Sequence, residues 1–208
     1  MYPHLLPEFF NYLFPMYDLM IGIGILVMLF FVLNRFEKHD GFSKSKSNKI
    51  IVLIAVSLLG ALLFSFVLDG VFHSIKEGRL TFGSINFLGA LIGGFLSFFI
   101  LLKYVFKEAF KDKKRITNTV ITGVVIAHAI GRVGCFFAGC CYGIPTETFL
   151  GVSFPYGQAP VKYPSLMVFP TQLFEAGFLF IFFVLLNRLK VFKEKQTQAY
   201  LIGYGIWR

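Results

Sequence analysis

Acidic residues are scarce in this sequence. Its 208 residues include 11 Asp and Glu against 20 Lys and Arg, which leaves a formal net charge of +9. A positive charge of this size can indicate nucleic-acid binding. Here, however, most of the basic residues lie in short loops between apolar runs, where membrane topology accounts for them. We therefore expect no nucleic acid among the partners of this protein.

Two further features are missing. The first 15 residues contain no Lys or Arg, whereas a secretory signal peptide begins with a positively charged segment. We therefore expect no cleavable signal peptide. The ten-residue segments of alternating hydrophobicity that form an outer-membrane barrel are also absent from the sequence, which argues against strands.

The sequence instead contains long apolar runs. Hydrophobic residues make up 56% of the chain, against about 45–50% in soluble domains, and the mean hydropathy is +0.72. The runs span residues 17–33, 50–68, 85–102, 116–130, 171–187 and 199–207. The first five approach the roughly 20 residues that a helix needs to cross a bilayer, and backbone groups in lipid must be paired within the segment. We predict an all-α polytopic membrane bundle with about six transmembrane helices, in which residues 1–208 form a single transmembrane domain.

The sixth run is short and stops at Arg208. We expect that the protein continues beyond this residue with a seventh helix. The basic residues also predict an orientation, because five, six and four of them fall in the loops 34–49, 103–115 and 188–198. Cytoplasmic loops carry the excess of Lys and Arg, so the N-terminus and the segments 69–84 and 131–170 are predicted to lie outside.

Most of the unusual chemistry lies in residues 128–142. Arg132 stands at the end of an apolar run, between Gly131 and Gly134. An arginine at such a position is costly unless an anion meets it, and a guanidinium binds phosphate with two parallel hydrogen bonds. The glycines permit positive φ and a close approach of the backbone. We predict an anion-binding bend; the alternative is an arginine that reaches into the headgroup layer.

His128 precedes Arg132 by four residues, so on a continuing helix the two share a face. A neutral imidazole at this position is a candidate general base. The alternative is a histidine that packs between helices and is hydrogen-bonded across the bundle.

Gln172 and Glu175 lie at the beginning of the fifth run. A carboxylate within a span is rare unless it is paired, and Arg132 or Arg208 is the predicted partner of Glu175. A purely structural salt bridge is the alternative.

The cysteines number three, at positions 135, 140 and 141. Zinc sites usually show paired cysteines and four ligands, and here no second pair follows. We predict no metal site, and we interpret the three thiols as small packing residues. A membrane thiol oxidoreductase that uses Cys135, Cys140 and Cys141 is an alternative function. The small residues of the segment 89–94 predict close helix packing.

Several patches, in this order, make the chain resemble the prolipoprotein diacylglyceryl transferase family. Residues 131–143, GRVGCFFAGCCYG, are similar to the signature G-R-x-G-N-F-x-N-x-E-x-x-G, and residues 169–175, FPTQLFE, to H-P-[ST]-Q-L-Y-E. The other patches are FPMYDLMIG at 14–22, FLGALIGG at 87–94 and GYGIWR at 203–208. The departures from the family pattern include Leu88 and Phe169, which replace His, Cys135, which replaces Asn, and Cys140, which replaces Glu.

The resemblance implies transfer of a diacylglyceryl group from phosphatidylglycerol to the lipobox cysteine thiol of prolipoproteins. This occurs at the outer face of the bacterial plasma membrane and needs no cofactor. Arg132 and Arg208 would meet the charge of the leaving glycerol phosphate, and with Leu88 unable to act as a base, His128 is the candidate. The remaining implied roles are catalytic for Tyr17 and substrate-binding for Gly89, Gly131, Gly134, Gly143, Gln172 and Glu175. A non-catalytic relative that binds membrane lipids is a further alternative.

Overall fold

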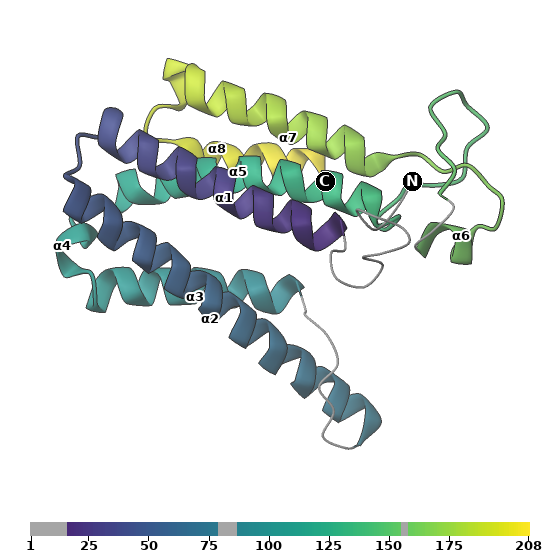
Figure 1. Ribbon diagram of the computed structural model, residues 1–208, viewed down its shortest axis with the longest axis horizontal. Coiled ribbons are helices and arrows are strands. Elements are labelled where there is room, and N and C mark those ends of the chain that lie inside the picture. The colour runs from purple at the N-terminus through teal and green to yellow at the C-terminus, as the bar shows by residue number, and fades with distance from the viewer. Residues whose placement is uncertain (1–15, 79–86, 155–157) are drawn as a thin grey trace, which may run out of the picture. The chain divides into compact units, whose positions relative to one another are not determined.

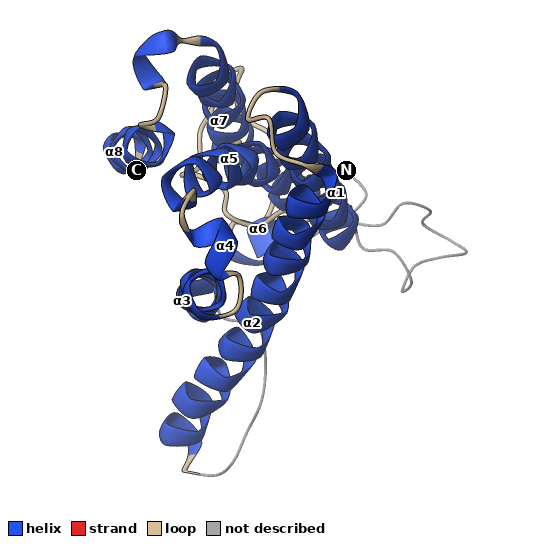
Figure 2. Cartoon of the chain, turned by 90° about the vertical axis from the view of Figure 1, so that its left-hand side faces the viewer, coloured by secondary structure: helices blue, strands red, loops and turns tan. Residues whose placement is uncertain are grey.

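The computed structural model describes residues 16–78, 87–154 and 158–208. Its elements are α1 (Met16–Lys38), α2 (Lys44–Glu77), α3 (Phe87–Tyr104), α4 (Lys107–Phe110), α5 (Lys113–Phe137), α6 (Gln158–Lys162), α7 (Thr171–Arg188), η1 (Lys190–Phe192) and α8 (Gln196–Trp207) (Figure 1). Where their residues are described, each of the six apolar runs falls on a helix. Figure 2 shows only helices and loops among the described residues. The prediction of an all-α bundle is confirmed.

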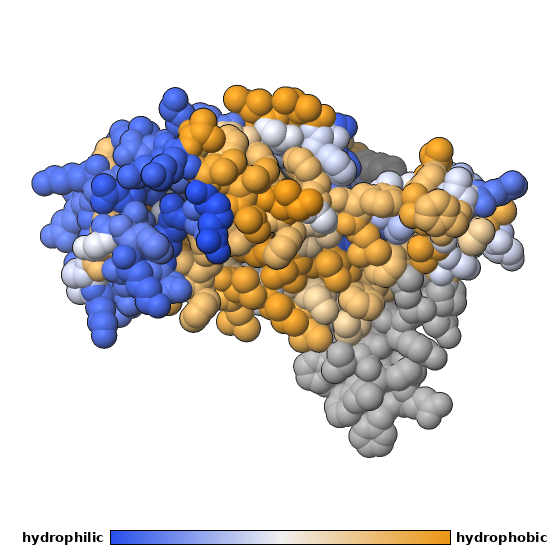
Figure 3. Space-filling model, turned by 90° about the horizontal axis from the view of Figure 1, so that it is seen from above, coloured by the Kyte–Doolittle hydropathy of each residue, from blue (hydrophilic) through white to orange (hydrophobic). Residues whose placement is uncertain are grey.

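Four of these helices are long and apolar enough to cross a membrane: α1, α2, α5 and α7. Helix α3 is apolar but shorter, and α8 has 12 residues. On the face that Figure 3 shows, hydrophobic residues form a broad region, and most of the hydrophilic residues gather apart from it. The chain is therefore a multi-pass membrane protein. The predicted orientation and seventh helix stay predictions, and the N-terminal segment without basic residues lies outside the described part of the chain.

The chain divides into two compact units, residues 33–116 and residues 1–32 with 117–208. In the first unit, α2 and α3 pack closely through small residues. A Cβ atom added to Gly89 would lie 2.7 Å from the Cα atom of Ser65, and one added to Gly93 would lie 2.3 Å from the Cβ atom of Phe64. The predicted close packing of the segment 89–94 is confirmed, and the substrate-binding role of Gly89 stays a prediction.

The second unit is built on α1, α5, α7 and α8. Its apolar core lies between α5 and α7 and includes Val125 and Leu179, both fully buried. Two hydrogen bonds hold the beginning of α8 beside α5. The Asn118 Oδ1 atom accepts them from the Thr197 backbone N–H at 3.0 Å and from the Thr197 hydroxyl at 2.7 Å. These bonds help hold the later residues of α8 next to the C-terminal half of α5.

Helix α5 corrects one prediction. It continues to Phe137, so the predicted anion-binding bend at Gly131 and Gly134 is wrong and Arg132 is a helical residue. Gly134 serves close packing instead, because a Cβ atom there would lie 2.9 Å from the Cβ atom of Met20 in α1. The positive φ that the bend required occurs later, at Gly139 with φ 62°.

Candidate active site

Glu175 is the centre of a polar cluster inside the second unit. It lies one turn into α7, and only 4% of its surface is exposed. Its Oε1 atom lies 2.8 Å from an Nη atom of Arg132 and accepts a hydrogen bond of 2.8 Å from the Tyr204 hydroxyl. His128 Nε2 lies 3.7 Å from the same oxygen, and an Nη atom of Arg208 lies 3.8 Å from Oε2. A buried carboxylate needs such partners, and the prediction that Arg132 or Arg208 pairs with Glu175 is confirmed for both arginines.

His128 and Arg132 share one face of α5, as their spacing predicts, since both approach Glu175. The Nδ1 atom of His128 lies 3.2 Å from the Tyr200 hydroxyl, and its ring packs edge-on against Tyr204 with centroids 5.3 Å apart. Both ring nitrogens therefore face side chains of the protein.

Sequence reasoning missed Tyr200 and Tyr204 as members of the site. They are four residues apart on α8, so one helical face presents both hydroxyls. The signal was available in part, because Tyr204 lies in the patch 203–208, in which only Arg208 is assigned a role from the sequence. Their approach to α5 and α7 depends on how α8 packs, which the local sequence does not encode.

The Arg132 guanidinium has hydrogen-bonding capacity beyond its ion pair. Its side chain is 13% exposed, and its Nε atom is buried without a hydrogen-bond partner among the described residues. The group also lies within hydrogen-bonding reach of the Cys141 thiol. A buried donor without an acceptor costs free energy, so the Arg132 guanidinium is suited to donate a hydrogen bond to an anionic oxygen of a ligand.

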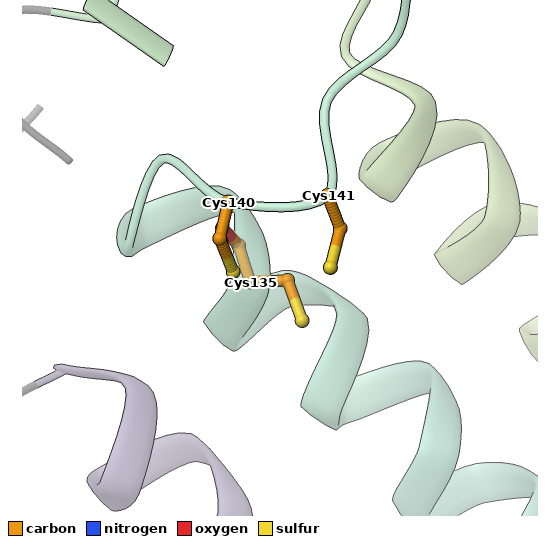
Figure 4. A group of neighbouring side chains, drawn as sticks. All are labelled: Cys135, Cys140 and Cys141. Carbon is orange, nitrogen blue, oxygen red and sulfur yellow. The ribbon is translucent and has the colours of Figure 1, made fainter. Parts of the chain in front are cut away.

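The loop after α5 folds back on the helix end. Gly139 and Cys141 both have positive φ, of 62° and 58°, and the backbone N–H and the thiol of Cys140 both point to the Cys135 carbonyl, at 3.2 and 3.7 Å. This turn gathers all three thiols, whose sulfur atoms lie within 4.8 Å of one another (Figure 4). The spacing in the sequence did not indicate this gathering, because it results from two residues in the left-handed region.

The thiols influence one another electrostatically. Hydrogen bonds from the Cys135 and Cys140 thiols lower the pKa of Cys141, and the nearby Arg132 acts in the same direction. Hydrogen bonds with the Cys135 and Cys141 thiols raise the pKa of Cys140. The cluster therefore has one sulfur on which negative charge is favoured, and that sulfur belongs to Cys141, which is exposed.

The first turn of α7 holds this loop in place. Gln172 Nε2 donates a hydrogen bond of 2.6 Å to the Cys140 carbonyl, and the Thr171 hydroxyl donates one of 2.9 Å to the Cys141 carbonyl. Gly143 continues the contact, because a Cβ atom there would lie 2.8 Å from the Thr171 Cγ2 atom. Gln172 and Gly143 thus lie at the site as structural supports, and their role in substrate binding stays a prediction.

The other predicted residues take different positions. Tyr17, in the first turn of α1, packs on α5 at Gly134, with its carbonyl oxygen 3.4 Å from the position of a Cβ atom there. Arg208 is the most exposed member of the cluster, with 68% of its side chain accessible. A Cβ atom added to Gly131 would meet no atom within 4 Å.

The fold and the site together define a multi-pass helical membrane protein with a buried arginine–glutamate pair beside two tyrosines and a thiol cluster. Residues 7–208 match the prolipoprotein diacylglyceryl transferase family, and the chain belongs to that family. The resemblance seen in the sequence patches is confirmed, and the chain is a transferase of this class.

Three relatives illustrate the match. A phosphatidylglycerol–prolipoprotein diacylglyceryl transferase of Clostridium tetani is 31% identical over 198 residues, which cover 92% of this chain and 77% of the relative. The second enzyme of that name from Clostridium perfringens is 28% identical over 220 residues, covering 98% of this chain and 79% of the relative. The transferase of Parasynechococcus marenigrum is 27% identical over 205 residues, covering 92% and 72%.

Proposed function

We propose that this protein transfers the diacylglyceryl group of phosphatidylglycerol to the lipobox cysteine of prolipoproteins at the outer face of the bacterial plasma membrane. The observation that carries the proposal is the hydrogen-bonding environment of the Arg132 guanidinium. Its guanidinium is held by the buried Glu175 at 2.8 Å, and its Nε atom is buried without a partner among the described residues. A phosphate oxygen is the acceptor that such a fork prefers.

The reaction makes a definite demand on the site. The cysteine sulfur forms a bond to the glyceryl carbon that carries the phosphate, the C–O bond to that phosphate breaks, and glycerol phosphate leaves with the electron pair. Negative charge grows on the departing phosphate, so a fixed cation nearby lowers the barrier. Arg132 is our candidate for this role, and the more exposed Arg208 supplies a second positive charge at the same carboxylate.

The remaining members of the cluster position these arginines. Glu175 orients Arg132, and the Tyr204 hydroxyl fixes Glu175 through its 2.8 Å hydrogen bond. The hypothesis that His128 is a general base stays untested. Because its two nitrogens face Tyr200 and Glu175, we assign it a positioning role. Family membership favours the transferase over the alternative thiol oxidoreductase.

Replacement of Arg132 by Ala and by Lys tests the proposal. Purified protein is mixed with phosphatidylglycerol in detergent micelles and a lipobox peptide, and release of glycerol phosphate is measured. We expect Arg132→Ala to lower turnover by at least about 100-fold, the usual effect of removing one group that stabilises developing charge. Arg132→Lys keeps the charge without the fork and is expected to fall between Ala and the wild type.

The matched control is Arg115→Ala in the same helix. The Arg115 side chain donates a 3.4 Å hydrogen bond to the Asp40 carbonyl oxygen at an exposed position, and the turnover of this variant is expected to equal that of the wild type. Unchanged turnover in folded Arg132→Ala protein would contradict the assignment of Arg132. Binding of phosphatidylglycerol without any release of glycerol phosphate by the wild type would identify the non-catalytic lipid-binding relative instead.

A further inference from the structure

The thiol cluster has the dimensions of a metal site. Its three sulfur atoms lie within 4.8 Å of one another. Sulfurs bound to one Zn²⁺ ion at about 2.3 Å each lie roughly 4 Å apart. The cluster therefore needs to contract by less than about 1 Å to surround a single ion. Rotation of side chains about Cα–Cβ can supply a movement of this size.

The backbone around the cluster is already fixed. Cys141 has a φ of 58°, a left-handed conformation that a non-glycine residue keeps only where the surrounding structure holds it. The side chains of Gln172 and Thr171 hold the carbonyls of Cys140 and Cys141, so the first turn of α7 supports this backbone. Two ligands on a clamped loop and a third, Cys135, on the last turns of α5 form a set that is ordered without a metal.

The charges also fit a divalent ion. Three thiolates and one Zn²⁺ ion carry a net charge of −1. Arg132 lies beside Cys141, and Arg132 and Arg208 together bring two positive charges to the single negative charge of Glu175. The remaining positive charge offsets that of the complex. Packing alone does not explain the arrangement, since Cys135 is buried, Cys140 is half-buried and Cys141 is exposed. A sulfur that served only packing would be covered.

We propose that Cys135, Cys140 and Cys141 bind one Zn²⁺ ion as thiolates and leave its fourth position open for the acceptor thiol. The part that concerns the acceptor rests on the function proposed above. Zinc with three protein ligands and one exchangeable position is the pattern of catalytic sites, and a thiol that coordinates zinc is deprotonated outright.

The proposed step balances without a redox change. The acceptor thiol binds zinc through sulfur and releases its proton to water. The zinc-held thiolate then forms the C–S bond to the glyceryl carbon as the C–O bond to phosphate breaks, and glycerol phosphate leaves beside Arg132. The site thus places the nucleophile next to the guanidinium that we assign to the leaving group. Coordination to zinc also deprotonates the acceptor thiol, a step in which the Leu88 side chain cannot act as a base.

Metal binding is tested first, independently of activity. The whole chain in detergent micelles is reduced, freed of metal with a chelator and titrated with Zn²⁺, or with Cd²⁺, which gives a sulfur-to-metal absorption band. We expect one ion per chain, and loss of the band in Cys135→Ser, Cys140→Ser and Cys141→Ser. The control His39→Ala removes an exposed imidazole of the other unit and is expected to bind as the wild type does.

Serine variants that fail to fold would give no information, so a second measurement uses the wild type alone. Bound Zn²⁺ is expected to slow alkylation of all three cysteines, read by mass spectrometry. The zinc proposal fails if no stoichiometric band appears, if the band persists in the folded serine variants, or if Zn²⁺ leaves alkylation unchanged.

The acceptor position is tested with peptides. A lipobox peptide with cysteine is expected to shift the sulfur-to-cadmium band, whereas the same peptide with serine is not. Metal-free protein is expected to transfer at least about 100-fold more slowly, in the range that proton transfer contributes, and one equivalent of Zn²⁺ is expected to restore the rate. Full turnover by metal-free protein would overturn the zinc role and leave the transferase function standing. Zinc binding without any transfer would overturn the proposed function and, with it, the acceptor position.

Discussion

The Arg132 guanidinium on α5 lies 2.8 Å from the Glu175 carboxylate on α7. The two residues are 43 positions apart in the sequence, and their ion pair joins α5 to α7. Both side chains are largely buried. A buried pair contributes little net stability when complete, but removal of one partner leaves a charge without compensation. The pair therefore gives the arginine its orientation, and the site depends on both residues.

Loss of the carboxylate charge is expected to affect stability and turnover together. Glu175→Ala leaves Arg132 buried without its partner and should lower the free energy of unfolding by about 3–5 kcal/mol. Glu175→Gln keeps the shape and should cost less. Thermal unfolding in detergent measures both variants. The control is Glu108→Gln, whose ion pair with Lys49 is exposed and should contribute at most about 1 kcal/mol. Equal losses at Glu175 and Glu108 would contradict the buried pair.

The Tyr204 hydroxyl is expected to matter more than that of Tyr200. Tyr204→Phe removes a hydrogen bond of 2.8 Å to a carboxylate, which is expected to cost about 1.5–3 kcal/mol. Tyr200→Phe removes a contact of 3.2 Å with an imidazole and is expected to cost about 0.5–1.5 kcal/mol. Unfolding temperature and transfer rate, measured in parallel, rank the two. The reverse order would show that Glu175 is not the centre of the cluster.

His128→Gln separates positioning from proton transfer. If His128 orients Glu175, turnover falls by about tenfold, equivalent to 1.4 kcal/mol, and the pH–rate profile keeps its shape. If His128 is a general base, the acid limb of the profile disappears. Transfer rates across the accessible pH range decide between the two roles. We expect the unchanged profile, and a missing limb would restore the general-base hypothesis.

Two glycines of α5 provide a matched comparison. A Cβ atom at Gly134 would lie 2.9 Å from the Cβ atom of Met20, whereas one at Gly131 would meet nothing within 4 Å. Gly134→Ala is therefore expected to destabilise the protein by about 1–3 kcal/mol through overpacking. Gly131→Ala is expected to be neutral or to stabilise the helix by up to about 1 kcal/mol. Thermal unfolding measures both, and similar effects at the two positions would argue against the close contact between α1 and α5.

Much of the helical architecture could be predicted because its cause is local. A long apolar run must pair its own backbone groups in lipid, so the runs at 17–33 and 116–130 predicted α1 and α5 without knowledge of their neighbours. The spacing of His128 and Arg132 predicted a shared face by the same logic. The glycines around Arg132 misled us, because a glycine in a close helix contact and a glycine in a bend look alike in sequence.

Sequence alone determined that this chain forms apolar helices and that Arg132 stands at the end of an apolar run, because hydrophobicity and helical periodicity act over a few turns of the chain. Only the tertiary structure decided which groups surround that arginine. Glu175 reaches it from α7, and Tyr204 reaches the same carboxylate from α8. Two residues with positive φ bring Cys140 and Cys141 back over Cys135. Such convergence depends on side-chain packing between distant segments, which local propensity does not specify.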